Sequence, residues 1–153
     1  MWTYICQRDP RWAQVRIGES HATLGRSGCT CSCLSMLSSF FDCFQTPDQI
    51  ASHNGWFNTL GEVLWNKLQF ARMVFTNRQY GRNDIMIKAA IKGPNTAVML
   101  QVAHGSHWVV ALRPTLLGRS YIVADPWLGD SCDVIKRYGN ITGAAYFRSA
   151  KPL

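Results

Sequence analysis

The sequence of 153 residues lacks any apolar run approaching about 18 residues, so we expect no membrane-spanning segment. Its first residues, MWTYICQRDPRW, lack a basic stretch followed by an apolar one, so we also expect no secretory signal. Internal repeats, low-complexity tracts and linkers are absent as well. With 47% hydrophobic and 16% charged residues, the chain is typical of a globular protein with a hydrophobic core. We expect one domain that spans residues 1–153.

Acidic residues are scarce: 9 Asp and Glu stand against 16 Lys and Arg, for a formal net charge of +7. The basic residues are scattered and form no block of five or more. This pattern predicts a mild attraction to an anionic surface, such as nucleic acid or cell wall, and contains no binding motif. A well-solvated surface is the simpler interpretation of the same charge.

Helical patterns fill the first part of the chain. They follow an N-terminal arm whose apolar residues predict packing against the domain, and a loop over residues 18–28. Apolar residues at helical spacing predict a helix over about 30–42. Thr46-Pro47 predicts the start of a second helix, with Gly55 near its end. We expect two further helices at about 60–70 and 85–92, the last one capped by Asp84.

Strand character begins after Pro94. Short apolar runs alternate there with residues typical of hairpin loops. The expected strands are TAVMLQV (96–102), HWVVAL (107–112), YIVAD (121–125) and GAAYFR (143–148). Helices followed by an antiparallel sheet indicate an α+β fold.

Three of the six cysteines, Cys29, Cys31 and Cys33, stand at alternate positions. A structural zinc site usually takes pairs of ligands spaced Cys-x₂₋₄-Cys, and the chain has no second cysteine pair, although His104 and His107 could add ligands. Disulfides within the cluster would be strained in a helix, and without an export signal we expect reduced thiols. Zinc therefore stays the weaker alternative, and we expect no metal and no cofactor.

A nucleophile is the stronger interpretation of this cluster. Cys29 follows Gly28 at the predicted helix start, where free amides and the positive end of the helix dipole stabilise a thiolate. Cys33 is in phase with the apolar face of the helix and is expected in the core. Cys31 has no assigned role.

A thiolate nucleophile needs a general base and a group that orients it. His107 begins one predicted strand and Asp125, 18 residues later, ends the next. If the two strands form a hairpin, these ends meet and Asp125 can fix the tautomer of His107. A packed structural histidine and a common Asp-Pro turn are the alternatives, and His104 is the nearest rival for the base.

Together these motifs resemble papain-like cysteine peptidases of the bacteriocin-processing-peptidase-like group. The matching stretches occur in the family's order and span most of the chain: QRDPRW (7–12), GCTCSCLSML (28–37), TPDQI (46–50), HWVVAL (107–112) and YIVADPW (121–127). The resemblance implies a papain-like fold, with the nucleophile at a helix N-terminus and the N-terminal helices packed on a C-terminal antiparallel sheet.

The family's roles carry over onto matching positions. The resemblance implies that Cys29 is the nucleophile, His107 the base and later the acid, and Asp125 the residue that orients His107. It also implies that Gln7 donates to the oxyanion of the tetrahedral intermediate, with Gln14 as the fallback. A purely structural role for Gln7 in the N-terminal arm is the alternative.

The expected function is hydrolysis of a peptide or isopeptide bond through a Cys29 acyl-enzyme, with a peptide or protein as substrate and no cofactor. Two alternatives use the same fold: an inactive binding or structural protein, and a phage hydrolase of peptidoglycan cross-bridges. A metal or redox protein using CTCSC is the third class. By analogy with stand-alone domains of this kind, we expect the cytoplasm of a bacterial host or a phage particle.

Overall fold

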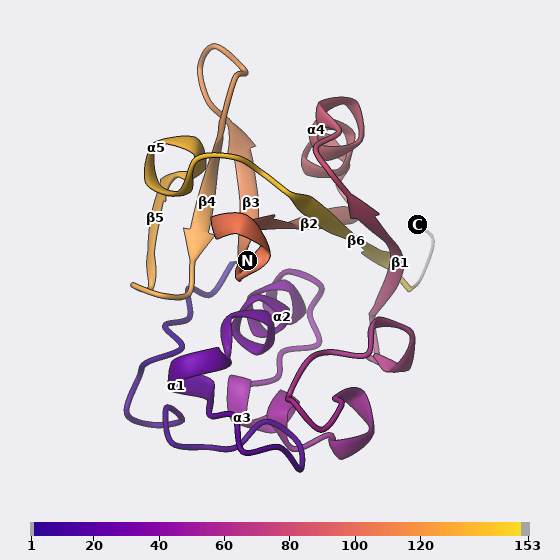
Figure 1. The fold of residues 1–153 in the computed structure, drawn as a ribbon. Coiled ribbons are helices and arrows are strands. Elements are labelled where there is room, and N and C mark those ends of the chain that lie inside the picture. Colours follow the sequence, from indigo (N-terminus) through magenta and orange to yellow (C-terminus); the bar gives the residue numbers. More distant parts are fainter. Residues whose placement is uncertain (1, 151–153) are drawn as a thin grey trace.

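The computed structural model of the protein describes residues 2–150; residues 1 and 151–153 of the expected domain lie outside them. A six-stranded antiparallel sheet runs through the molecule in the order β1-β6-β2-β3-β4-β5 (Figure 1). Its strands are β1 (Met73–Tyr80), β2 (Thr96–Val102), β3 (His107–Pro114), β4 (Tyr121–Asp125), β5 (Asp130–Asp133) and β6 (Gly143–Ser149). The α+β class expected from the sequence is confirmed.

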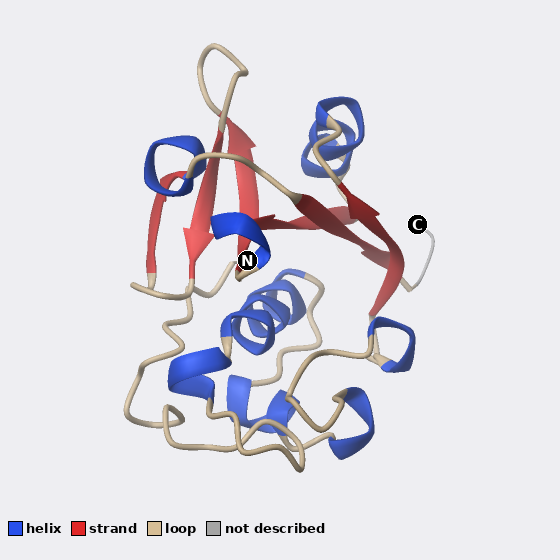
Figure 2. Cartoon of the chain, viewed as in Figure 1, coloured by secondary structure: helices blue, strands red, loops and turns tan. Residues whose placement is uncertain are grey.

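Helices cover both faces of the sheet (Figure 2). One face carries α1 (Leu24–Ser27), α2 (Cys29–Phe40) and α3 (Pro47–Ala51), and the other carries α4 (Asp84–Lys92) and α5 (Val134–Tyr138). In β2, Met99 joins the core under α2, whereas Val98 and Leu100 join the core under α4. Because both faces are buried, this strand is a continuous apolar run in the sequence. None of the helices within residues 2–150 combines the length and the hydropathy that crossing a membrane requires.

Most predicted elements are present. The helix expected at 30–42 is α2, and all four predicted strands exist. Thr46 precedes α3 with Pro47 as its first residue, but this helix ends at Ala51 and not near Gly55, which lies in a 3₁₀ turn at Asn54–Trp56. The helix predicted at 85–92 is α4, but the predicted cap is wrong. Asn83 caps it instead, because its side-chain oxygen accepts the Met86 N–H at 3.1 Å.

The helix predicted over residues 60–70 is wrong. That stretch is irregular, with a single 3₁₀ turn at Trp65–Lys67. The side chain of Asn58 accepts the N–H groups of Leu60 and Glu62, each at 2.9 Å, which replaces the hydrogen bonds of a helical turn. Gly61 then has φ +81°, a left-handed conformation that ends any helix.

Two α-helices and two strands of the described residues were not predicted: α1, which lies within the expected loop 18–28, α5, β1 and β5. Strand β1 precedes α4 and pairs with β6, so the helices do not all come before the sheet. It is an edge strand whose pairing shifts between Phe75 and Asn77, and this bulge interrupts the alternation that would have identified it. The helices α1 and α5 are too short to show helical periodicity.

Gly28 sets the direction in which α2 begins. Its N–H donates to Leu24 O at 2.8 Å, and its own carbonyl accepts the Ser32 N–H at 2.9 Å, so it joins the end of α1 to the start of α2. A Cβ atom at this position would lie 2.4 Å from Leu24 O and 2.7 Å from Leu24 Cα. Only glycine allows this close approach, which positions the residue that follows.

We expect Gly28→Ala to lower the free energy of unfolding by about 1–3 kcal/mol, because backbone atoms must move to admit the methyl group. Gly55→Ala is the matched control, since no atom lies within 4 Å of a Cβ built there. It should change stability by only about 0.5 kcal/mol in either direction. Chemical unfolding followed by circular dichroism measures both, and equal effects would contradict the steric argument.

Candidate active site

Cys29 is the first residue of α2, directly after the Gly28 turn, and its side chain is partly exposed. No side chain caps the start of this helix, so the N–H groups of its first turn lack a capping acceptor. These N–H groups and the helix dipole create a positive potential at the helix start. The expected nucleophile therefore lies where a negatively charged sulfur is stabilised.

His107 and Asp125 lie at adjacent ends of two paired strands. His107 begins β3 and Asp125 ends β4, and the two strands run antiparallel. The Nε2 atom of His107 lies 2.8 Å from Oδ1 of Asp125. Both residues are buried, with relative exposures of 8% and 1%.

His107 also interacts with the side chain of Cys29. Burial by itself lowers the pKa of His107, but the hydrogen bond with Asp125 and the interaction with Cys29 outweigh burial and raise this pKa to about 9. Because Nε2 faces Asp125, Nδ1 is the ring nitrogen left for the thiol. The structure thus brings together the three side chains that the sequence analysis proposed as a triad.

Four donors hold the carboxylate of Asp125. Oδ1 accepts from His107 and from the backbone N–H of Trp127 at 2.9 Å, while Oδ2 accepts from Arg137 Nη1 at 2.9 Å and from the Tyr138 hydroxyl. Burial raises the pKa of Asp125, but these hydrogen bonds more than offset it and leave that pKa well below its usual range. An ionised Asp125 accepts the Nε2–H of His107 and so selects the tautomer whose Nδ1 is free to take a proton.

Arg137 and Tyr138 were missed by the sequence analysis. Both belong to α5, and the Tyr138 ring lies 5.1 Å from the His107 ring between centroids. The one usable signal was Asp133, whose side chain accepts from the N–H groups of Ile135 and Lys136 and caps α5. An Asp before a short apolar pair is too common to have indicated a helix by itself.

Gln7 lies between the Asp125 turn and α1. Its backbone N–H donates to Pro126 O at 2.8 Å, and its side-chain Nε2 lies 3.3 Å from Gly25 O and 3.5 Å from Leu24 O. The side chain is buried, and its Oε1 has no hydrogen-bond partner among the described residues. Gln14, the fallback, is exposed on the N-terminal arm.

The other two cysteines of the cluster point into the core. Cys31 and Cys33 are buried, and burial raises the pKa of both thiols well above its usual range. All six cysteines are free thiols, and residues 2–150 contain no group of three or more side chains placed to hold a metal ion. The CTCSC cluster thus presents one accessible sulfur, that of Cys29, to His107.

His104, the rival candidate for the base, is exposed in the turn before β3.

A cleft of about 500 Å³ opens beside Cys29. Its walls come from the start of α2, the loop 60–65, β1, β2 and the beginning of β3. Its lining includes Glu62, Trp65, Arg78, Tyr80, Gln101 and Trp108. A peptide lying in this cleft would pass the Cys29 sulfur.

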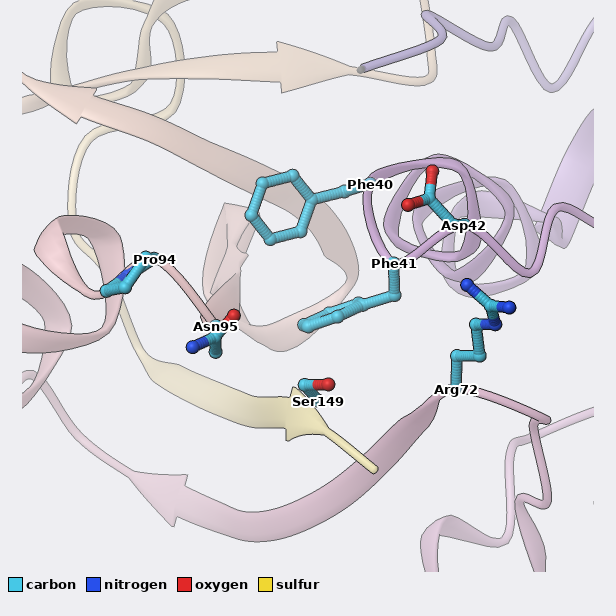
Figure 3. A pocket seen from close by; sticks show the side chains of 7 residues that line it. All are labelled: Phe40, Phe41, Asp42, Arg72, Pro94, Asn95 and Ser149. Atoms are coloured by element: carbon cyan, nitrogen blue, oxygen red, sulfur yellow. The ribbon is translucent and has the colours of Figure 1, made fainter. Parts of the chain in front are cut away.

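A second cavity, of about 350 Å³, lies at the opposite end of α2 (Figure 3). The rings of Phe40 and Phe41, whose centroids are 5.0 Å apart, line it together with Asp42 and Arg72. None of the described residues that line it is a cysteine or a histidine. The proposed nucleophile therefore lies at the cleft beside the start of α2 and not at this second cavity.

Comparison with known proteins does not identify the site. No family model matches the chain, and a search of curated proteins gave no match either. The resemblance to bacteriocin-processing peptidases therefore stays a prediction. The site is interpreted from its own geometry: a thiol at a helix start, an imidazole beside it, and a buried carboxylate behind the imidazole.

The raised pKa of His107 makes stability depend on pH. A group whose pKa rises on folding stabilises the folded state fully below its unfolded pKa and loses that contribution as pH rises through its folded pKa. For His107 the contribution is present below pH 6.5 and is lost as pH passes about 9. We expect the free energy of unfolding to fall over this interval by on the order of 1 to 3 kcal/mol more in wild type than in His107→Gln.

Urea unfolding at fixed pH values between about 6 and 10 measures this difference. Burial raises the pKa of Cys132 to about 11, so this thiol also lowers the free energy of unfolding at high pH. That effect is the same in wild type and in His107→Gln. Parallel curves for wild type and variant would mean that folded His107 retains no extra proton, and the interaction with Asp125 and Cys29 would then be refuted.

Proposed function

We propose that the protein is a papain-like cysteine peptidase that hydrolyses a peptide or isopeptide bond. The observation that carries the proposal is the connected series Cys29, His107, Asp125, with the thiol at the start of α2 and the carboxylate buried. A nucleophile, a base and an orienting group in that order are the arrangement that acyl-enzyme chemistry requires. The helices packed on an antiparallel sheet agree with the papain-like architecture.

In the first half of the reaction, His107 Nδ1 takes the proton of the Cys29 thiol, and the sulfur attacks the carbonyl carbon of the substrate. The carbonyl π electrons move to oxygen and form a tetrahedral oxyanion. When this intermediate collapses, the C–N bond breaks and protonated His107 gives its proton to the leaving amine. A thioester on Cys29 remains.

In the second half, His107 takes a proton from water and the oxygen attacks the thioester. Collapse of the second intermediate releases the carboxylic acid, and the proton returns to the sulfur, so the enzyme is regenerated. Asp125 stays ionised throughout and stabilises the imidazolium that forms in each half. Every proton is carried by His107, and the chemistry uses no cofactor.

The oxyanion is stabilised by the Cys29 N–H and by Gln7. The backbone of Gln7 is fixed beside the Asp125 turn, but its Nε2 faces the carbonyl oxygens of Leu24 and Gly25. These hydrogen bonds are long and therefore weak, so the amide can turn from them to an oxyanion. Losing such a donor typically costs about 10²-fold in rate.

The proposal covers more than one substrate class. A peptidoglycan cross-bridge contains the same amide bond, and a phage hydrolase acting on it would use the same residues. The contrasting proposal is an inactive binding protein with the same fold. In such a protein Cys29 would react like any partly exposed thiol.

Alkylation rates at each cysteine distinguish these two possibilities. We expect iodoacetamide to modify Cys29 about tenfold faster than Cys6 or Cys43 at pH values below 7, because only Cys29 contacts a protonated imidazole. His107→Ala should remove this advantage. Peptide mass spectrometry after timed quenching measures all six rates in one sample. Equal rates at Cys29 and the other partly buried thiols would favour the inactive protein.

Turnover gives a second test of the triad. On a mixed library of quenched fluorescent peptides, Cys29→Ala should abolish cleavage, and Asp125→Asn should lower kcat by about 10²- to 10⁴-fold through the wrong histidine tautomer. Cys43→Ala is the matched control and should cleave like wild type. Unchanged cleavage by Cys29→Ala would refute the assignment of the nucleophile.

A further inference from the structure

Four residues in register form a row across the sheet at the wall of the cleft. Tyr80 of β1 is paired with Gly143 of β6, Gly143 with Gln101 of β2, and Gln101 with Trp108 of β3. Tyr80, Gln101 and Trp108 all line the cleft that contains Cys29. Because Trp108 directly follows His107 in the chain, the row leads from the edge of the sheet to the proposed catalytic base.

Arg78 lies across this row. Its guanidinium carbon is 4.1 Å from the centroid of the Tyr80 ring and 4.9 Å from that of the Trp108 ring. Its Nη2 donates to Gln101 Oε1 at 3.0 Å, and its Nη1 donates to the carbonyl of Gln79. The guanidinium is therefore held in one place by two aromatic faces and two acceptors.

Gly143 provides the space for this guanidinium. A Cβ atom at Gly143 would lie 2.6 Å from Arg78 Nη1 and 2.9 Å from Gln101 Oε1. Any other residue there would push the cation away from Gln101. The local sequence and the strand register together thus build a position for one cation inside the cleft.

The charge of Arg78 is not neutralised by a carboxylate within residues 2–150. Arg11, Arg82 and Arg137 each form an ion pair with an aspartate, whereas the acceptors of Arg78 are an amide and a carbonyl. Among the described residues that line the cleft, Glu62 is the one acidic side chain, and it is exposed and accepts from Asn58 Nδ2 at 3.2 Å. Burial lowers the pKa of Arg78, as expected for a cation removed from water without an anion.

We propose that Arg78 is a specificity residue that binds a carboxylate of the substrate, so that the cleft selects acidic peptides. The inference rests on the proposed peptidase function and names its substrate class. A guanidinium has five N–H donors, and its hydrogen bonds to Gln79 and Gln101 leave donors for a carboxylate. The carboxylate can come from an Asp or Glu side chain or from the C-terminus of a peptide.

Irreversible peptide probes test whether Arg78 selects a carboxylate, and they need no known substrate. The first set consists of tripeptide vinyl sulfones that carry either Glu or Gln at each position in turn. The second set consists of iodoacetyl-Ala-Ala ending in either a free carboxylate or an amide. Labelling of Cys29 is followed by mass spectrometry, and the ratio of the acidic to the neutral probe of each pair is the measured quantity. The first set detects a side-chain carboxylate and the second a terminal one.

We expect wild type to label faster with the acidic member of at least one pair, by about tenfold or more, as a charge-assisted hydrogen bond provides. Arg78→Gln should reduce that ratio to about one, and Arg78→Lys should retain part of it, because a single ammonium lacks the guanidinium fork. Arg113→Gln removes the same charge from an exposed position of β3 outside the cleft lining and should keep the wild-type ratio.

Three results would overturn the inference. Equal labelling by acidic and neutral probes in wild type would refute it while leaving the peptidase proposal intact, since Cys29 would still react quickly. An unchanged ratio in Arg78→Gln, or an equal loss in Arg113→Gln, would show that general charge attraction causes the preference. Labelling of Cys29 no faster than of the other partly buried cysteines would refute the peptidase proposal and this inference together.

Discussion

The buried carboxylate of Asp125 is the constraint on which the rest of the site depends. An ionised carboxylate removed from water is costly unless donors surround it, and removing one partner of a buried charge typically costs about 3–5 kcal/mol. The donors here come from β3, from the turn after β4 and from α5. Satisfying this one group therefore fixes the relative positions of three segments, and the imidazole is oriented as a result.

The sheet and α2 supply the remaining geometry. Pairing of β3 with β4 places His107 and Asp125 at one end of the sheet, and the packing of α2 on β3 brings the start of that helix to the same end. Cys33 donates to Trp108 O at 3.3 Å, which ties the interior of α2 to the residue after His107. The inert thiol in the core thus helps to position the proposed reactive one.

How much the sequence predicts depends on how local the cause is. Gly28-Cys29 and the apolar runs of β3 and β4 can be recognised from the local sequence alone. The triad could therefore be proposed before its geometry was known. The turn at 58–62 forms because the Asn58 side chain accepts hydrogen bonds from backbone N–H groups. The spacing of apolar residues carries no information about such a contact. Arg78 could not be found in this way, since its surroundings come from four strands that meet only in the folded sheet.

The N-terminal arm has a consequence for biosynthesis. Gln7 donates its N–H to Pro126 O, and Arg8 Nε donates to Trp127 O at 2.9 Å, so the N-terminal arm is bound to the turn that follows Asp125. During translation Cys29 leaves the ribosome long before His107 and Asp125. A partly synthesised chain therefore carries a thiol without its partners, and the site assembles only when the sheet closes over α2 late in synthesis. The proposed hydrolase would therefore have no complete site while its own synthesis is under way.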